Sequence, residues 1–258
     1  MDLGIKGKVA LVTGGSRGLG KHAALSLAGE GVNVAISGRT PETLEKTVAE
    51  LKGLGVSSIG VAADISDLSS SEELHQKIVD SLGPIDILVN NAGGGRPSNT
   101  VADTSFENYL GTFNLNLFGA FKLMQLTVPH MQAQHWGRII SITSIYGREY
   151  GGNISYMSAK AALIATTKHA GVTLAKDGVL FNTIAPGSIL HEQGGWESFQ
   201  NDNPPEVVED FIKNNLPMGK FGWPEPVGDL VAFLASEKAN LITGACIVVD
   251  GGQSHSLI

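Results

Sequence analysis

Short apolar segments alternate with longer amphipathic segments along most of the chain, and this alternation is the strongest constraint on its fold. The short segments are apolar on both faces, as strands buried inside a parallel sheet are. The expected strands are 8–13, 32–37, 58–62, 85–89, 138–143, 179–184 and 245–249. The expected helices between them are 18–30, 41–54, 68–82, 106–134, 153–176 and 226–236. This alternation predicts an α/β fold, with a parallel sheet covered by helices on both faces.

The alternation is interrupted once, at residues 188–217, where no strand pattern is present. Glycines and prolines punctuate this segment, and Trp196 and Phe199 lie within it. A connection of this length in a compact domain is usually a functional lid or a short helical excursion, so we expect a substrate loop or lid excursion here. Because the chain has no internal repeat or linker, residues 1–258 are predicted to form a single domain.

Composition excludes several classes of protein. Hydrophobic residues make up 42% of the 258 residues, which is enough for a sizeable core. The net charge of −7 argues against nucleic acid or an anionic membrane as the main partner. Cys246 is the one cysteine, so neither an intramolecular disulfide nor a cysteine-based zinc site is possible, and no metal is expected. With no signal peptide or membrane-span pattern, the sequence predicts a soluble, cytoplasmic protein.

A glycine-rich turn, with Gly14, Gly18 and Gly20, follows the first expected strand and opens the first expected helix. Glycines let a backbone approach the diphosphate of a dinucleotide, and the helix N-terminus offers N–H groups and a positive dipole. The alternative interpretation is a tight strand-to-helix turn without a ligand.

Seven motifs, taken in order, resemble those of the short-chain dehydrogenase/reductase superfamily, and in overall character the 3-oxoacyl-acyl-carrier-protein reductases. They are residues 13–20, 90–93, Asn116, Ser144, 156–160, 186–187 and 250–252. The resemblance extends over residues 7–252. It implies a doubly wound, Rossmann-type sheet of seven mainly parallel strands, an oxidoreductase acting on CH–OH and C=O groups, and a homotetramer.

The resemblance also implies a nicotinamide coenzyme. Gly38 stands where an acidic residue would bind the ribose of NAD, and Arg39 follows it, with Arg17 in the turn. Two guanidiniums can bind a 2′-phosphate, so NADP(H) is expected rather than NAD(H), although both arginines could also be solvated surface charges. The implied coenzyme-binding residues are Gly14, Ser16, Arg17, Gly18, Leu19, Gly20, Arg39, Asp64, Ile65, Asn91, Ala92, Gly93, Tyr156, Lys160, Pro186, Gly187 and Ile189.

Tyr156 and Lys160 are four residues apart on an expected helix and therefore share a face. An ammonium near a phenol lowers its pKa and makes it usable as an acid or base, whereas such a pair taken alone is usually ordinary helix surface. By resemblance, Ser144 holds the substrate carbonyl, with Thr143 as its rival. Asn116 resembles the asparagine that anchors a proton-relaying water.

The substrate is the least constrained part of the prediction. In the carrier-protein reductases, basic residues dock an acidic carrier, but here the corresponding places, 132–135 and 176–178, are nearly neutral. We therefore expect a small carbonyl or alcohol substrate, such as a sugar, polyol or keto acid. The alternatives are a 3-oxoacyl-[acyl-carrier-protein] reductase and a non-catalytic NADP-binding sensor or scaffold. His191 replaces a common family threonine and is taken as a surface loop residue rather than a pocket residue, and Arg148 is likewise taken as exposed.

Overall fold

The computed structural model describes residues 2–257, which contain one sheet of seven strands in the order β3-β2-β1-β4-β5-β6-β7. Each neighbouring pair is parallel. The strands are β1 (Val9–Thr13), β2 (Asn33–Gly38), β3 (Ser58–Ala62), β4 (Ile87–Asn90), β5 (Gly137–Ile142), β6 (Val179–Pro186) and β7 (Cys246–Val249). The predicted doubly wound parallel sheet is confirmed. Its order reverses between β1 and β4, the point where such sheets bind ligands at their carboxyl edge.

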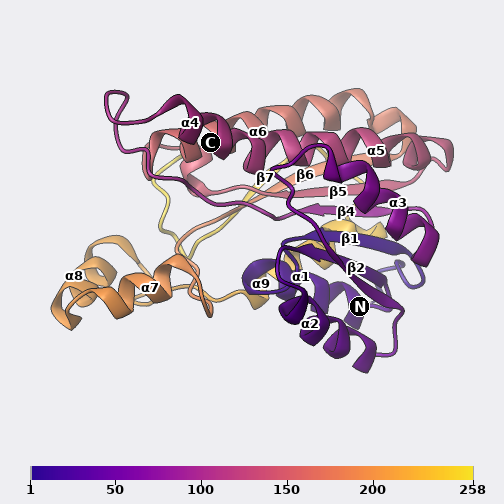
Figure 1. Cartoon of the computed structure of the whole chain (residues 1–258), viewed down its shortest axis with the longest axis horizontal. Helices are drawn as coiled ribbons and strands as arrows, with labels where there is room; N and C mark the ends of the chain where they lie inside the picture. The colour runs from indigo at the N-terminus through magenta and orange to yellow at the C-terminus, as the bar shows by residue number, and fades with distance from the viewer. Residues whose placement is uncertain (1, 258) are drawn as a thin grey trace.

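Helices cover both faces of the sheet (Figure 1). One layer holds α1 (Gly18–Gly29), α2 (Pro41–Gly53) and α9 (Glu225–Ala235), below the sheet in the figure. The other holds α3 (Ser70–Leu82), α5 (Gly119–Ala133) and α6 (Ile154–Thr173). The side chains of β1 alternate between them: Ala10 and Val12 join the first layer, whereas Val9 and Leu11 join the second. This alternation follows from the two-residue period of a strand, and it explains why β1 is apolar on both faces.

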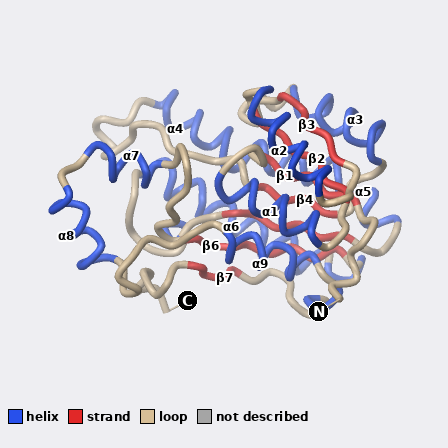
Figure 2. The backbone as a smooth tube through the Cα atoms, turned by 90° about the horizontal axis from the view of Figure 1, so that it is seen from below, coloured by secondary structure: helices blue, strands red, loops and turns tan. Residues whose placement is uncertain are grey.

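One expected helix is divided, and the interrupted segment contains short helices. The predicted helix 106–134 is divided into α4 (Phe106–Phe113), a π-helical turn (Asn114–Phe118) and α5. The segment 188–217 contains two helices, α7 (Gly195–Asp202) and α8 (Pro205–Asn215). Both views show α7 and α8 standing beyond the layered body (Figures 1 and 2). Within residues 2–257, no helix is long and apolar enough to span a bilayer.

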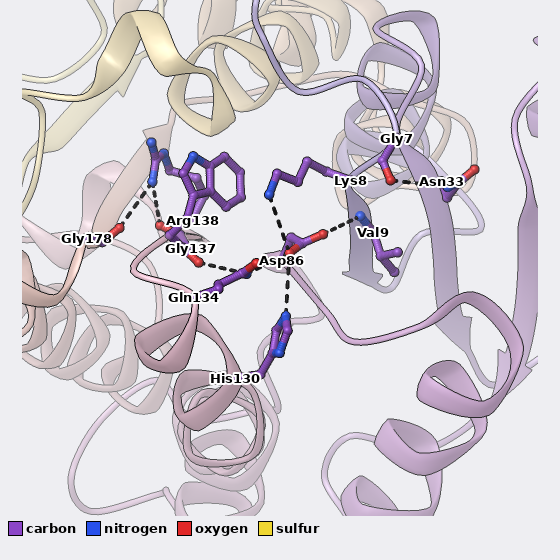
Figure 3. Close-up of polar contacts among 11 residues, drawn as sticks. Gly7, Lys8, Val9, Asn33, Asp86, His130, Gln134, Gly137, Arg138 and Gly178 are labelled. Atoms are coloured by element: carbon purple, nitrogen blue, oxygen red, sulfur yellow. Dashed lines mark hydrogen bonds and ion pairs between the residues drawn. The ribbon is translucent and has the colours of Figure 1, made fainter.

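A polar network closes the amino-terminal edge of the sheet (Figure 3). The carboxylate of Asp86 accepts hydrogen bonds from Val9 N at 3.0 Å and from Gln134 Nε2 at 2.7 Å. The Nζ atom of Lys8 and the Nε2 atom of His130 lie 3.8 Å and 3.7 Å from the same side chain. The network therefore joins the starts of β1 and β4 to the end of α5, at the edge opposite the carboxyl ends of the strands.

Candidate active site

The turn between β1 and α1 fits a diphosphate. Gly14 and Gly18 have φ values of 63° and 53°, and a Cβ on Gly20 would lie 2.3 Å from the carbonyl oxygen of Gly14. Arg17, the N-cap residue of α1, provides no side-chain cap, and the first turn of the helix, which includes Leu19, carries no acidic residue. The first N–H groups of α1 therefore remain available to an anionic ligand.

The end of β4 is fastened to this turn. The N–H groups of Asn91 and Ala92 both donate to Thr13 Oγ1 at 2.9 Å, and Asn91 Nδ2 donates to Thr13 O at 2.8 Å. The same Nδ2 atom would lie 3.0 Å from a Cβ on Gly14. The motifs at 13–20 and 90–93, more than seventy residues apart in the sequence, thus form one surface.

Beside this surface, Ser16 Oγ would lie 3.3 Å from a Cβ on Gly38, and Arg39 follows as an exposed side chain. The Ser66 hydroxyl donates to Asp64 and keeps the pKa of that carboxyl below its usual value, and the positive charge of Arg39 adds to the effect. Ile65 is buried behind Asp64. A nucleoside bound here would meet hydroxyl groups, the Asp64 carboxylate and the guanidinium of Arg39.

Arg17 makes a contact that the sequence did not predict. Its Nη1 atom donates to the carbonyl oxygen of Gln193 at 2.8 Å and lies 3.4 Å from the Gln193 side-chain oxygen. The guanidinium thus joins the glycine-rich turn to the segment before α7. Because a guanidinium carries five N–H donors, others remain for a phosphate.

Ser144, Tyr156 and Lys160 meet at the carboxyl end of β5. Lys160 is buried, and its Nζ atom lies 5.5 Å from the centre of the Tyr156 ring. Ser144 faces the Tyr156 phenol closely enough to lower its pKa by hydrogen bonding. The rival hydroxyl, Thr143 Oγ1, instead donates to Ile184 O at 2.9 Å within the sheet. One hydroxyl, one phenol and one amine therefore converge.

Burial is the largest influence on the pKa values of Tyr156 and Lys160. It raises the pKa of Tyr156 to about 12, despite the hydrogen bond with Ser144 that lowers it. The lowering of the tyrosine pKa expected from the Lys160 ammonium is not seen in the protein alone, where desolvation raises that pKa. Burial also lowers the pKa of Lys160 to about 8. At neutral pH the phenol is protonated and the amine is mostly charged.

Asn116 lies at the centre of the π-helical turn and is buried. Its Nδ2 atom donates to Gly94 O at 2.7 Å, and its Oδ1 atom accepts from Gly94 N at 3.1 Å. A Cβ on Gly93 would lie 2.8 Å from Asn116 Oδ1 and 3.0 Å from Lys160 Nζ. The turn thus presents Asn116 beside Lys160, with only a glycine backbone between them.

Strand β6 ends at Pro186, and the segment after it begins with Gly187 and forms an isolated parallel bridge between Ile189 and Gly222. Leu190 N donates to Gly222 O at 2.9 Å, and Gly222 N donates to Ser188 O at 3.0 Å. In a parallel bridge the central residue's own N–H and C=O point the other way. Those groups of Ile189 have no hydrogen-bond partner among residues 2–257, so they suit a ligand with one donor and one acceptor, such as a carboxamide.

An aromatic cluster packs α7 against α8. The ring of Trp196 lies 4.8 Å from that of Phe211 and 5.3 Å from that of Phe221, and Phe199 stacks edge-on at 5.6 Å. The imidazole of His191 packs against Gly18. It therefore covers the glycine-rich turn and is not the free surface side chain that the sequence favours.

A family model described as Enoyl-(Acyl carrier protein) reductase matches residues 14–254. The 3-oxoacyl-[acyl-carrier-protein] reductase FabG of Staphylococcus aureus (strain N315) is 36% identical over 248 residues, which cover 95% of this chain and 98% of that protein. The chain belongs to the short-chain dehydrogenase/reductase family. Membership confirms the resemblance stated from the motifs, and it makes the protein an oxidoreductase of CH–OH and C=O groups.

Solved structures of this short-chain dehydrogenase/reductase family superimpose over the whole chain. L-Sorbose reductase from Gluconobacter frateurii, complexed with NADPH and L-sorbose, has a TM-score of 0.92 and 31% identity, with 100% of each chain covered. A 7α-hydroxysteroid dehydrogenase, complexed with NADH and 7-oxo glycochenodeoxycholic acid, has a TM-score of 0.89 and 31% identity, with 100% of this chain and 98% of that chain covered.

Sequence reasoning missed two residues beside the site of this short-chain dehydrogenase/reductase. Asn153 caps α6, accepting from Tyr156 N at 3.0 Å, and an asparagine just before a predicted helix is a recognisable signal. Gln253 is buried against Ser188. No local pattern predicts this contact, because Gln253 lies beyond the last strand.

Proposed function

We propose that the protein is an NADP(H)-dependent reductase of small carbonyl compounds, which moves a hydride between the nicotinamide ring and a C=O or CH–OH carbon. The observation that carries this proposal is the convergence of Ser144, Tyr156 and Lys160 at the carboxyl edge of the sheet, beside the glycine-rich turn. Metal-free hydride transfer needs this combination: a coenzyme site, a proton donor and a group that stabilises the developing alkoxide.

The proposed coenzyme site runs along the carboxyl edge. Gly14, Gly18, Leu19 and Gly20 hold the diphosphate, and Asn91, Ala92 and Gly93 line the ribose beyond it. Asp64 and Ile65 border the adenine, while Pro186, Gly187 and Ile189 border the nicotinamide. When bound, the coenzyme supplies or accepts the hydride. The fit rests on the uncapped first turn of α1 and on the backbone groups of Ile189, which have no partner within the described residues 2–257.

The preference for NADP(H) over NAD(H) rests on the end of β2. Arg39 follows Gly38, so no carboxylate stands where it would repel a 2′-phosphate or bind a free 2′-hydroxyl. Ser16 and Arg17 add a hydroxyl and a second guanidinium from the turn. The L-sorbose reductase relative was solved with NADPH, and the hydroxysteroid dehydrogenase with NADH, so the family alone leaves the choice to these residues.

In the proposed mechanism Tyr156 donates its phenolic proton to the carbonyl oxygen while the carbonyl carbon receives the hydride. A pKa of about 12 keeps that phenol protonated at neutral pH, which suits the reduction direction. Ser144 orients the same oxygen and stabilises its developing charge. The Lys160 ammonium supports the tyrosinate that remains and binds the nicotinamide ribose, and Asn116 holds a water that returns the proton.

A small free substrate is favoured over a carrier-bound one. The docking surface of a carrier-protein reductase needs exposed basic side chains beside the site. At the corresponding places here, residues 132–135 and 176–178 are nearly neutral, and Gln132 donates to Asp177 within the fold. Similarity to L-sorbose reductase favours a sugar or polyol, whereas identity to FabG favours the second candidate, a 3-oxoacyl-[acyl-carrier-protein] reductase.

One experiment separates these candidates. We would follow NADPH oxidation with ketoses, keto acids, small aldehydes and an acetoacetyl-carrier protein, with Tyr156→Phe as the inactive control. Turnover of a free polar carbonyl at low substrate concentration supports the proposal. Turnover confined to the carrier-bound substrate would overturn the substrate class, and turnover of nothing in the panel favours a non-catalytic NADP-binding sensor or scaffold.

The quaternary structure and location belong to the same proposal. A homotetramer is supported by exposed apolar side chains on α4 and near the start of α5, including Phe106, Leu110 and Phe121, and by the partly exposed edge strand β7. The cytoplasmic location and the single-domain organisation with a lid at 188–217 stay predictions from the sequence.

A further inference from the structure

The chain reverses direction after β7 and returns to the site. The carboxylate of Asp250 accepts from Gly252 N at 2.8 Å and from Ser254 N at 2.7 Å. Gly251 and Gly252 have φ values of 64° and 84°, a backbone conformation that favours glycine. The Asp-Gly-Gly sequence therefore builds a turn, and the turn delivers Gln253 to the end of β6.

Gln253 and Ser188 form a buried pair. Ser188 N donates to Gln253 Oε1 at 2.7 Å, and Gln253 Nε2 donates to Ser188 Oγ at 2.9 Å. Only 8% of Gln253 and 4% of Ser188 is exposed, so neither group has water as an easy substitute. A Cβ on Gly187 would lie 2.6 Å from Gln253 Oε1. The glycine before Ser188 is therefore what lets the glutamine approach.

Ser188 is held from two sides. Its carbonyl oxygen accepts from Gly222 N at 3.0 Å, and its N–H group is taken by Gln253. Ile189, the next residue, is left with its N–H and C=O groups directed away from Gly222 and without partners among residues 2–257. The direction of the Ile189 N–H depends on how Ser188 is fixed, because that N–H and the Ser188 carbonyl belong to one planar peptide. The Ile189 C=O is oriented through the next peptide, whose Leu190 N–H donates to Gly222 O.

The same C-terminal segment also holds the loop between Ser144 and Tyr156. Glu149 Oε2 accepts from Ser254 Oγ at 3.0 Å, His255 N at 2.8 Å and Ser256 N at 2.9 Å. The segment 250–256 is thus tied both to the loop that precedes α6 and to the start of the lid. The segment therefore contacts both the loop before α6 and the residues that follow β6, on two sides of the proposed site.

We propose that Gln253 is a positioning residue for the nicotinamide half of the coenzyme, acting through Ser188 and Ile189. Its amide fixes the Ser188 backbone so that Ile189 presents one donor and one acceptor to a carboxamide. This role rests on the proposed function. It concerns only the nicotinamide end, because Gln253 touches neither the glycine-rich turn nor Arg39.

The test compares two ligands that share everything except the nicotinamide: NADPH and 2′-phospho-ADP-ribose. Their dissociation constants are measured by calorimetry for the unaltered protein, for Gln253→Leu and for Gln76→Leu, a matched control on α3. Gln253→Leu leaves Ser188 N–H without its acceptor, so NADPH should bind about tenfold more weakly. Binding of 2′-phospho-ADP-ribose should change by no more than about twofold, and the control should change neither.

Gln253→Met, which is unbranched like glutamine, is the second variant if the leucine variant does not fold. Glu149→Ala loosens the same segment from its other anchor and should reproduce a weaker form of the selective loss. Equal weakening of both ligands would indicate a merely structural role and overturn the inference, as would no weakening of either. An unaltered protein that binds neither ligand would overturn the proposed function itself, a result distinguishable from both.

Discussion

The Nζ atom of Lys160 donates a hydrogen bond to the carbonyl oxygen of Ile142, the last residue of β5, at 2.8 Å. This bond ties the middle of α6 to the strand that ends beside Ser144. It uses one of the three donors of an ammonium, which leaves the others for ligands. Burial at this position lowers the pKa of Lys160 to about 8.

The buried lysine makes stability depend on pH. Between about pH 8 and 10.5 the unfolded chain holds a proton on Lys160 that the folded protein does not, so the free energy of unfolding should rise with pH in that window. The contribution is roughly 3 kcal/mol at about 1.4 kcal/mol per pKa unit. Lys160→Met should remove this rise, as measured by urea unfolding at several pH values. Lys46→Met, an exposed lysine on α2, should retain it, and an unchanged slope in Lys160→Met would contradict the assignment.

Replacing the phenol of Tyr156 should greatly lower kcat and leave coenzyme binding nearly unchanged. Tyr156→Phe removes the proton donor, which is expected to lower kcat by about 10²–10⁴-fold, the range typical of general acids. The NADPH dissociation constant should stay within about threefold, because the hydroxyl lies at the substrate end of the site. Steady-state kinetics and fluorescence titration measure the two effects. A variant that keeps turnover would remove Tyr156 from its role.

Arg39 should determine the choice of coenzyme. Arg39→Ala removes the guanidinium proposed to bind the 2′-phosphate, so the ratio of kcat/KM for NADPH to that for NADH should fall by about tenfold or more. Lys52→Ala, near the end of α2, is the matched loss of one exposed positive charge. If both variants shift the ratio equally, the general field of the protein rather than a specific contact selects the coenzyme.

Activity should require a residue without a side chain at Gly93. Gly93→Ala puts a methyl group within 2.8 Å of Asn116 Oδ1 and 3.0 Å of Lys160 Nζ, so one of these buried groups must move. We expect kcat to fall by about tenfold or more, since small misplacements of reacting groups are costly. Gly53→Ala is the control, because a methyl group there meets nothing within 4 Å and should stabilise the protein by up to about 1 kcal/mol.

The polar network around Asp86, at the amino-terminal edge of the sheet, should affect stability and not catalysis. Asp86→Ala removes the acceptor of Val9 N and of Gln134 Nε2, which should cost about 1–3 kcal/mol of unfolding free energy. Because this edge lies at the amino ends of the strands, kcat should stay within about twofold. Urea unfolding and steady-state kinetics check both points. Asp80→Ala, exposed on α3, should change little, and a large loss of kcat in Asp86→Ala would show coupling across the sheet.

Several features followed from local sequence patterns. Runs that are apolar at every position predicted the buried strands, and in β1 the side chains of Ala10 and Val12 pack on one helix layer while that of Leu11 packs on the other. The spacing of Tyr156 and Lys160 placed them on one helix face, and the order of the motifs identified the family. These properties depend on residues close together in the chain, so the periodicity of strands and helices is sufficient to reveal them.

Other features depend on contacts between distant segments, which no local pattern encodes. The sequence predicted an acidified Tyr156, but burial by the surrounding fold raises its pKa. The partner of Arg17 is Gln193, and the partner of Ser188 is Gln253, across 176 and 65 residues. Local patterns were sufficient to predict the order of elements and the chemical groups at the site. The protonation and the partners of those groups came from the fold, because desolvation and hydrogen bonding depend on which distant segments it brings into contact.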